Sequence, residues 1–238
     1  MELTGAQADL YETIRLGMEK TVREALQTKG LAPSQITILD ALLKLRQVCC
    51  HPQLVPLDAA KAVETSAKLD HLMTLLPEML AEGRRILLFS QFTSMLRLIE
   101  TELKKRELPW VKLTGQSQKR DAIIEQFTSG QVPLFLISLK AGGVGLNLPQ
   151  ADTVIHFDPW WNPAVENQAT DRAHRMGQTQ SVWVIKLVAQ GTIEERILAL
   201  QERKAQLAGS LYSGAAARKE PLFTESDLAE LLQPLSLS

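Results

Sequence analysis

The segment Ile86–Thr114 reads ILLFSQFTSMLRLIETELKKRELPWVKLT, and it contains two different periodicities. Short apolar runs at 86–90 and 111–114 have the length and residue types of buried strands, whereas the stretch between them, 93–106, is amphipathic like a helix. A strand, a helix and a second strand in this order form a unit whose two strands pair in parallel. The segment therefore predicts part of an α/β fold.

The same alternation continues on both sides of this segment. Further strand-like runs lie at 134–138, 154–157 and 182–188, and further amphipathic stretches lie at 66–81, 117–128 and 164–174. The chain is therefore predicted to form a parallel sheet flanked by helices. Right-handed crossovers would place the loops that follow the strands along one edge, which is the usual ligand edge of an open sheet.

Helical patterns without strands occupy the two ends of the chain. They lie at 3–26, where apolar residues recur every four positions; at 34–51, where Ser34 is a possible N-cap; at 191–208; and at 225–232, where Thr224 is a possible N-cap. Residues 53–64 have no sustained period and are typical of a linker. We expect three parts: a helical segment at 1–60, an α/β lobe at 61–208 and a helical tail at 209–238.

The composition is that of an ordinary globular protein. The 238 residues suffice for one large domain, or for one domain with a helical appendage, and 45% hydrophobic with 22% charged residues excludes wholesale disorder. The net charge of -1 means that a nucleic-acid surface would have to be a local basic patch. No apolar run approaches the roughly 18 residues of a membrane span, and residues 1–5 lack the basic flank and apolar core typical of a signal peptide. A cytoplasmic protein is therefore expected.

The two cysteines, Cys49 and Cys50, are adjacent and are followed by His51. Adjacent cysteines rarely form an unstrained disulfide, and they lack the spacing of a zinc site. The favoured role is packing at a helix end before Pro52, metal binding there is the less favoured alternative, and no metal site is predicted.

Residues 168–178 read QATDRAHRMGQ and place Arg172 and Arg175 three residues apart on one expected helix face. An arginine stays charged at physiological pH, and its planar fork matches phosphate oxygens, so such a pair suits the charge that develops during phosphoryl transfer. The alternative is a solvated helix face on which Asp171 and Glu166 serve as ion-pair partners.

Residues 138–148 read SLKAGGVGLNL and follow a predicted strand. Gly142, Gly143 and Gly145 would let the backbone approach a ligand closely, so that amide N–H groups could meet phosphate oxygens. A plain strand-to-helix turn is the alternative. A nucleotide P-loop is not indicated, because no Gly-Lys-Ser or Gly-Lys-Thr follows the glycines.

Four segments together resemble the motifs of the Swi/Snf-type ATPases, which belong to helicase superfamily 2. Residues 86–92 resemble motif IV, 138–148 motif V, 158–163 the family's tryptophan box and 168–178 motif VI, in the family's order, and the flanks 45–52 and 191–196 also match. A set of motifs in order is far more specific than any single pattern. The resemblance, to bacterial members in particular, implies the C-terminal lobe of a DNA-dependent ATPase, with a RecA-like sheet.

The resemblance also implies which residues face ATP. Gln168, Arg172 and Arg175 fall on the family's glutamine and its two arginines. Both arginines are therefore expected to be catalytic contacts to the phosphates of ATP. Gly145 and Asn147 are expected near the interface between lobes, where ATP is held.

The motif resemblance places several DNA contacts as well. Ser138, Lys140 and Gly142 are expected to touch the nucleic-acid backbone. Trp161 matches the family's single tryptophan before Asn-Pro and is expected to face DNA, while the default for a large aromatic is burial in the core, the expected place of Trp160.

Three further DNA contacts are predicted from position alone. Gln91 follows a predicted buried strand, where an amide can reach a sugar or phosphate, and Ser117 and Arg120 lie at a predicted helix N-terminus that favours an anion. The alternatives are that Gln91 takes part in a helix cap with Ser90 or Thr93, and that Ser117 is simply an N-cap.

A complete motor of this family also needs a Walker-type lysine and an acidic Asp-Glu pair, and the sequence contains neither. The chain is thus expected to be the second lobe of a larger protein, with ATP and Mg²⁺ held mainly by the first lobe of the same polypeptide and double-stranded DNA as its partner. Alone it is expected to hydrolyse no ATP. A bacterial, nucleoid-associated location would follow.

Two other functions remain open at this point. The fold could serve as a stand-alone module that binds nucleic acid or a protein through the surface of Arg172 and Lys140, or it could be a lobe of an RNA helicase, which shares the motif order. The Trp-Asn-Pro sequence and the Arg-Ala-His-Arg-Met-Gly-Gln ending favour the DNA branch, by resemblance.

Overall fold

The computed structural model describes residues 1–141, 146–161, 163–173, 181–211 and 223–236. Contacts group the chain into two compact units, one made of Met1–Ala67 with Ala189–Ser238 and the other of Lys68–Val188. The three-part division expected from the sequence stays a prediction.

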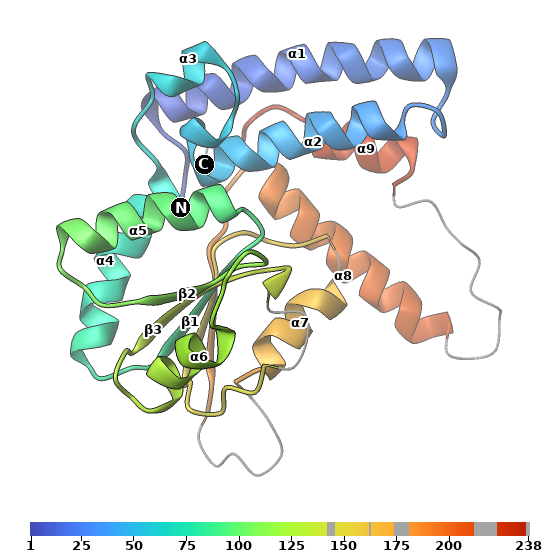
Figure 1. The fold of residues 1–238 in the computed structure, drawn as a ribbon. Coiled ribbons are helices and arrows are strands. Elements are labelled where there is room, and N and C mark those ends of the chain that lie inside the picture. Colours follow the sequence, from blue (N-terminus) through green and yellow to red (C-terminus); the bar gives the residue numbers. More distant parts are fainter. Residues whose placement is uncertain (142–145, 162, 174–180, 212–222, 237–238) are drawn as a thin grey trace. The chain divides into compact units, whose positions relative to one another are not determined.

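A five-stranded parallel sheet forms the centre of the unit Lys68–Val188 (Figure 1). Its strands are β1 (Ile86–Ser90), β2 (Val111–Leu113), β3 (Leu134–Ser138), β4 (Thr153–His156) and β5 (Trp183–Lys186), in the order β2-β3-β1-β4-β5. This confirms the predicted parallel sheet flanked by helices. In the register, Ser90 lies opposite Ser138 and Phe89 opposite His156, so the carboxyl ends of the central strands are level. The loops after them therefore share one edge.

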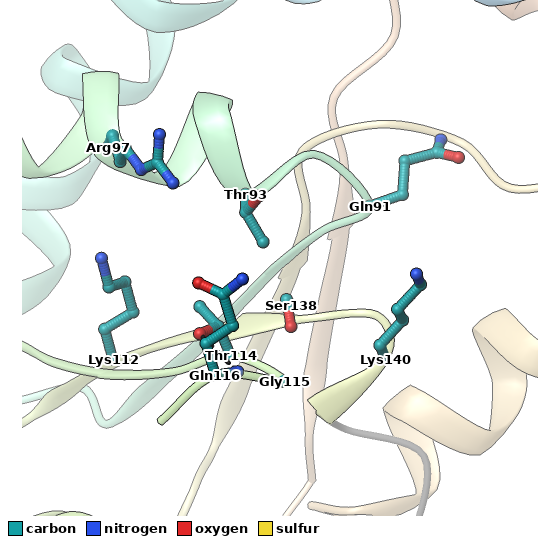
Figure 2. Close-up of a pocket in the computed structure, with 9 residues that line it drawn as sticks. All are labelled: Gln91, Thr93, Arg97, Lys112, Thr114, Gly115, Gln116, Ser138 and Lys140. Carbon is teal, nitrogen blue, oxygen red and sulfur yellow. Dashed lines mark hydrogen bonds between the residues drawn. The ribbon is translucent and has the colours of Figure 1, made fainter. Parts of the chain in front are cut away.

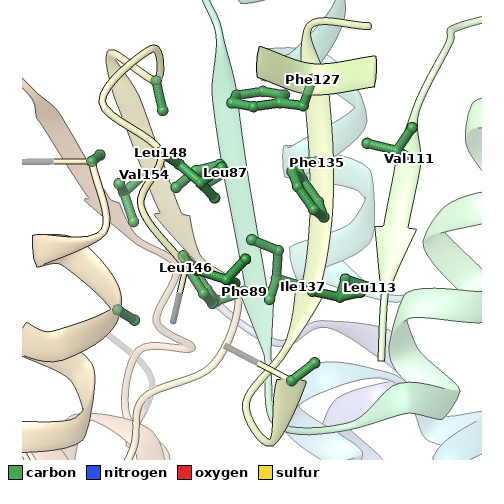
Figure 3. Close-up of a cluster of buried hydrophobic side chains, with 14 of the residues drawn as sticks. Leu87, Phe89, Val111, Leu113, Phe127, Phe135, Ile137, Leu146, Leu148 and Val154 are labelled. Atoms are coloured by element: carbon green, nitrogen blue, oxygen red, sulfur yellow. The ribbon is translucent and has the colours of Figure 1, made fainter. Parts of the chain in front are cut away.

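Helices pack on the sheet and bury its apolar residues. They are α4 (Ala67–Ala81), α5 (Thr93–Lys105), α6 (Arg120–Thr128) and α7 (Pro163–Asp171). Alternate residues of β1 and β3, including Phe89 and Phe135, form one core cluster with Phe127 of α6 and Ala169 of α7 (Figure 3). Helix α5 packs against β1 and β3. Because β1 and β3 are buried along their whole length, both read as continuous apolar runs.

One predicted helix start is wrong. The helix expected at 117–128 begins at Arg120, after Lys119, whose φ of 54° lies in the left-handed region. The Ser117 hydroxyl accepts a hydrogen bond from the Thr114 backbone N–H at 2.8 Å, so it closes the turn after β2 and does not cap α6. Short polar side chains bond to nearby backbone in turns as readily as at helix starts, which explains the error.

The other unit consists of helices. These are α1 (Gly5–Lys29), α2 (Gln35–Cys50), a 3-10 turn η1 (Pro52–Leu54), α3 (Asp58–Lys61), α8 (Ile193–Leu211) and α9 (Glu225–Leu231). Cys49 and Cys50 are fully buried at the end of α2 and form no disulfide with a described residue, which agrees with the packing role predicted for them. The segment expected to be a linker contains η1 and α3. None of the helices in the described part of the chain is long and apolar enough to cross a membrane.

The two predicted N-caps of this unit have different outcomes. Thr224 caps α9 in a reciprocal pair: its hydroxyl accepts from the Asp227 N–H at 3.1 Å, and the Asp227 carboxylate accepts from the Thr224 N–H at 3.0 Å. Ser34 stands at the start of α2, but its hydroxyl donates to the Ala25 carbonyl oxygen at 3.0 Å and caps nothing. Here a tertiary contact replaces the local one.

Candidate nucleic-acid interface

A pocket of about 480 Å³ lies where β1, β2 and β3 end (Figure 2). We call it the edge pocket; it is lined by Gln91, Thr93, Arg97, Lys112, Thr114, Gly115, Gln116, Ser138 and Lys140. It brings together three of the predicted DNA contacts, Gln91, Ser138 and Lys140. The other six lining residues were not predicted. Those after β2 follow a predicted strand at the same edge, a signal that could have located them, whereas Arg97 lies inside a helix.

The three predicted residues differ in how they are held. Lys140 is exposed and forms no ion pair with any described residue. Ser138 is buried, and its hydroxyl accepts from the Ala141 N–H at 3.3 Å. Gln91 donates its side-chain N–H to the Pro159 carbonyl oxygen at 3.2 Å. The N-cap of α5 is Phe92, so Gln91 does not cap this helix.

A buried carboxylate joins the loops that follow β1 and β4. Asp158 is 1% exposed, and it accepts from the Ser90 hydroxyl at 2.5 Å and from the Gln91 backbone N–H at 3.2 Å. Next to it, the buried Lys68 ammonium of α4 donates to the Phe157 carbonyl oxygen at 2.7 Å. These contacts fix the position of Gln91 at the edge pocket. Sequence reasoning gave Asp158 no such role, because its partners are about 68 residues away.

Ser117 and Arg120 lie beside the edge pocket and do not line it. Ser117 closes the turn after β2, and an Nη2 of Arg120 lies 3.5 Å from the Ala141 carbonyl oxygen, so Arg120 reaches the segment after β3. Gly142 lies outside the described residues.

The two adjacent tryptophans have different surroundings. Trp160 is 4% exposed and packs edge-on against Phe89 and His156, with ring centroids 6.5 Å and 5.9 Å away. It is a core residue, as expected. Trp161 is half-buried, and its contact with DNA stays a prediction.

The residues expected to face ATP lie after β3 and at the end of α7. Arg172 is half-buried; its Nη1 donates to the Leu146 carbonyl oxygen at 3.3 Å, and its own carbonyl accepts from the Leu148 N–H at 2.9 Å. Gln168 and Asn147 are exposed. These two hydrogen bonds tie Arg172 to the segment after β3. We call residues 168–178, which carry both predicted arginines, the arginine segment. Arg175 and Gly145 lie outside the described residues, as does His174.

The acidic residues near this arginine segment are in different environments. Asp171 is exposed, whereas Glu166 is buried and pairs with Lys186 of β5 across 2.5 Å. Glu166 is therefore paired with a cation of β5 and does not lie on a solvated helix face. The alternative interpretation of the two arginines had placed it on such a face.

His156, at the end of β4, is a buried histidine in this core. It is 1% exposed, stacks on Phe89 and forms a hydrogen bond through Nε2 with the Thr170 hydroxyl at 3.0 Å, while its Nδ1 has no hydrogen-bond partner among the described residues. Burial, aided by Lys186, lowers the pKa of His156 below 6.5, although the carboxylates of Glu166 and Asp158 oppose the shift.

Protonation of His156 should therefore destabilise the folded unit. Since the folded state binds the proton less readily than the unfolded state, the free energy of unfolding should fall as the pH drops below 6.5, by at most about 1.4 kcal/mol per pH unit until the folded pKa is reached. Urea unfolding at several pH values, followed by tryptophan fluorescence, measures this because all four tryptophans lie in the unit Lys68–Val188. His156→Gln should make the free energy of unfolding depend less on pH. His71→Gln, at an exposed site, should not have this effect. Equal slopes in all three proteins would contradict the assignment.

Comparison with known proteins identifies similar proteins that are ATP-dependent helicases, in agreement with the family resemblance of the sequence motifs. Residues 67–177 match the family described as "Helicase conserved C-terminal domain". A putative ATP-dependent helicase/translocase of Bacillus subtilis is 36% identical over 99% of this chain. The chain covers 25% of that relative, and 20% of two ATP-dependent helicases from Mycoplasma species. It thus spans about a fifth to a quarter of the length of these curated relatives.

Solved structures match the whole chain. The SWI2/SNF2 ATPase C-terminal domain of Sulfolobus solfataricus is 31% identical, with a TM-score of 0.70, and the match covers 100% of this chain and 96% of that one. The ATPase core of the same organism, in complex with dsDNA, is 32% identical with a TM-score of 0.73 over 100% of this chain and 49% of that chain. The chain therefore belongs to the SWI2/SNF2 family of helicase-type ATPases and has the fold of their C-terminal, RecA-like lobe.

Proposed function

We propose that this chain is the second motor lobe of an ATP-dependent translocase of double-stranded DNA. The observation that carries the proposal is the edge pocket, whose described lining consists of polar and cationic side chains, Lys140 among them, with Gly115 and without an acidic residue. A site of this composition suits a polyanion. The relative solved in complex with dsDNA, which matches the whole chain, favours DNA as that polyanion.

The side chains of the edge pocket suit the DNA backbone. Lys140 offers a point charge to a phosphate, the Gln91 amide retains a second N–H, and the Ser138 hydroxyl can turn to a phosphate or sugar oxygen. Contacts of this kind carry no sequence information, as a translocase that moves along any sequence requires. Ser117, Arg120, Gly142 and Trp161 are proposed as further DNA contacts.

The ATP side of the proposal rests on the arginine segment. Arg172 and Arg175 would contact the phosphates of ATP bound by the first lobe, with Gln168, Asn147 and Gly145 at the same interface. The described residues contain no group of three or more His, Cys, Asp or Glu side chains that could hold a metal ion. ATP and Mg²⁺ would be held mainly by the first lobe. Closure of the two lobes around ATP, followed by opening, would move the edge-pocket contacts along one strand.

The test is an ATPase assay with and without duplex DNA. The isolated chain is expected to hydrolyse no ATP, and the protein with both lobes is expected to hydrolyse it with DNA stimulation. In the latter, Lys140→Ala should raise the DNA concentration for half-maximal stimulation about tenfold, because a charge-assisted phosphate contact is lost.

Lys105→Ala is the matched control, since this exposed lysine of α5 pairs with Glu102 and does not line the edge pocket. It should leave the DNA dependence unchanged. Hydrolysis by the purified isolated chain, or equal effects of the two substitutions, would reject the proposal. Stimulation by duplex RNA alone would favour an RNA helicase lobe.

A further inference from the structure

The edge pocket extends beyond the predicted DNA contacts. Figure 2 shows Arg97 of α5 and Lys140 on opposite sides of the pocket, with Thr93 and Ser138 between them. Thr93 and Arg97 are four residues apart on α5, so both side chains project from the same helix face, and both line the pocket. The pocket thus has a second cationic end, formed by Arg97 of α5 and Lys112 of β2. Neither residue was predicted from the sequence to bind a ligand.

The charges at this second end are not equivalent. Lys112 of β2 is paired with the Glu100 carboxylate across 2.5 Å, and the other oxygen of Glu100 accepts from the Trp110 indole N–H at 3.0 Å. Glu100 lies three residues after Arg97 on α5, within reach of a helical ion pair, yet both its oxygens are already engaged. Arg97 is exposed and forms no ion pair with any residue that the structure describes. It is therefore the cation left for a ligand at this end.

The shape and chemistry of the edge pocket favour an extended anion. Small-molecule sites are mostly apolar with a few polar groups, whereas this lining is dominated by cationic, hydroxyl and amide side chains. A single phosphate would meet one of the two cations, since they stand on opposite sides. A strand of nucleic acid presents successive phosphates and can meet both.

We propose that Arg97 is a second phosphate anchor of the edge pocket and contacts a different phosphate of the DNA strand that Lys140 holds. This rests on the proposed function and extends it by one residue and one phosphate. The Arg97 guanidinium is planar and can bind two phosphate oxygens at once, which Lys140 cannot do. The Arg97 end would thus orient the strand as well as attract it.

The test measures binding of a short mixed-sequence DNA duplex to the 238-residue chain over a series of salt concentrations. Each neutralised phosphate contributes about 0.9 to the slope of log K against log salt. Arg97→Ala should therefore lower the magnitude of the slope by about 0.9 and weaken binding at low salt about tenfold. Arg97→Lys, which keeps the charge, should retain most of the slope but bind more weakly than the parent chain.

Arg106→Ala is the control, because it removes the same charge from the end of the same helix. Arg106 bonds with Glu102 and does not line the edge pocket, so this variant should keep the slope of the parent chain. If Lys140→Ala lowers the slope and Arg97→Ala does not, the Arg97 proposal fails while the proposed function stands. If neither substitution changes the slope, or the chain does not bind duplex DNA at low salt, both fail.

Discussion

Arg175→Ala, in the protein that carries both lobes, is expected to lower DNA-stimulated ATP hydrolysis by a factor of about 10³ to 10⁵. A permanently charged guanidinium at the γ-phosphate would offset the charge that spreads over the phosphoryl oxygens in the transition state, and no neutral side chain can replace it. ATP binding should be spared, because the first lobe would hold most of the nucleotide. The measurements are kcat at saturating DNA and the Kd for ATP.

Arg175 is the better choice for this test than Arg172. Arg172 also bonds to the Leu146 carbonyl, so its substitution would disturb the segment after β3 as well as any phosphate contact. Arg106→Ala, on the surface at the end of α5, serves as the control and should hydrolyse ATP at the parent rate. Turnover retained in Arg175→Ala would reject the assignment, and so would a loss of ATP binding that accounts for the whole effect.

Most of the sheet could be predicted because buried parallel strands leave a strong pattern. β1 and β3 are covered on both faces and read as unbroken apolar runs between amphipathic helices. β5 is less clear, since it is an edge strand with Trp183 and Val184 exposed, and its predicted range of 182–188 is longer than the observed Trp183–Lys186. Strand ends depend on the neighbour that pairs with them, which a local pattern does not encode.

The candidate site was predictable only in part, for a related reason. Gln91, Ser138 and Lys140 stand directly at or after strand ends, and all three line the edge pocket. The rule that ligands meet the carboxyl edge of a parallel sheet indicated Gln91. The contacts of Ser138 and Lys140 were expected from the motif resemblance. Arg97 lies inside α5, and a helix pattern alone does not say which part of its polar face borders a pocket. The partners of Ser117 and Ser34 were also beyond reach, because a hydroxyl can bond to a helix start, a turn or a distant carbonyl with similar energy.

Asp158→Asn should lower the free energy of unfolding of the unit Lys68–Val188 by about 2 to 4 kcal/mol. The buried Asp158 carboxylate accepts from two donors, the Ser90 hydroxyl and the Gln91 N–H. An asparagine has the same size, but only one of its terminal atoms accepts, so its NH₂ group would face one of these donors in a site closed to water. Urea unfolding followed by tryptophan fluorescence measures the change in this unit alone.

Asp152→Asn is the matched control, because Asp152 directly precedes β4 and Asp158 follows the same strand. Asp152 is half-buried, and its Oδ1 alone accepts both from the Arg85 N–H at 3.1 Å and from the Thr153 hydroxyl at 2.9 Å. The amide oxygen of an asparagine can keep both contacts, so the cost should stay below about 1 kcal/mol. Equal costs for the two substitutions would show that Asp158 is no special anchor.

Because Asp158 also holds the backbone of Gln91, Asp158→Asn should weaken DNA binding even under conditions where the unit is fully folded. A structural role alone would leave binding by the folded protein unchanged, and that difference separates positioning of the edge pocket from plain stability.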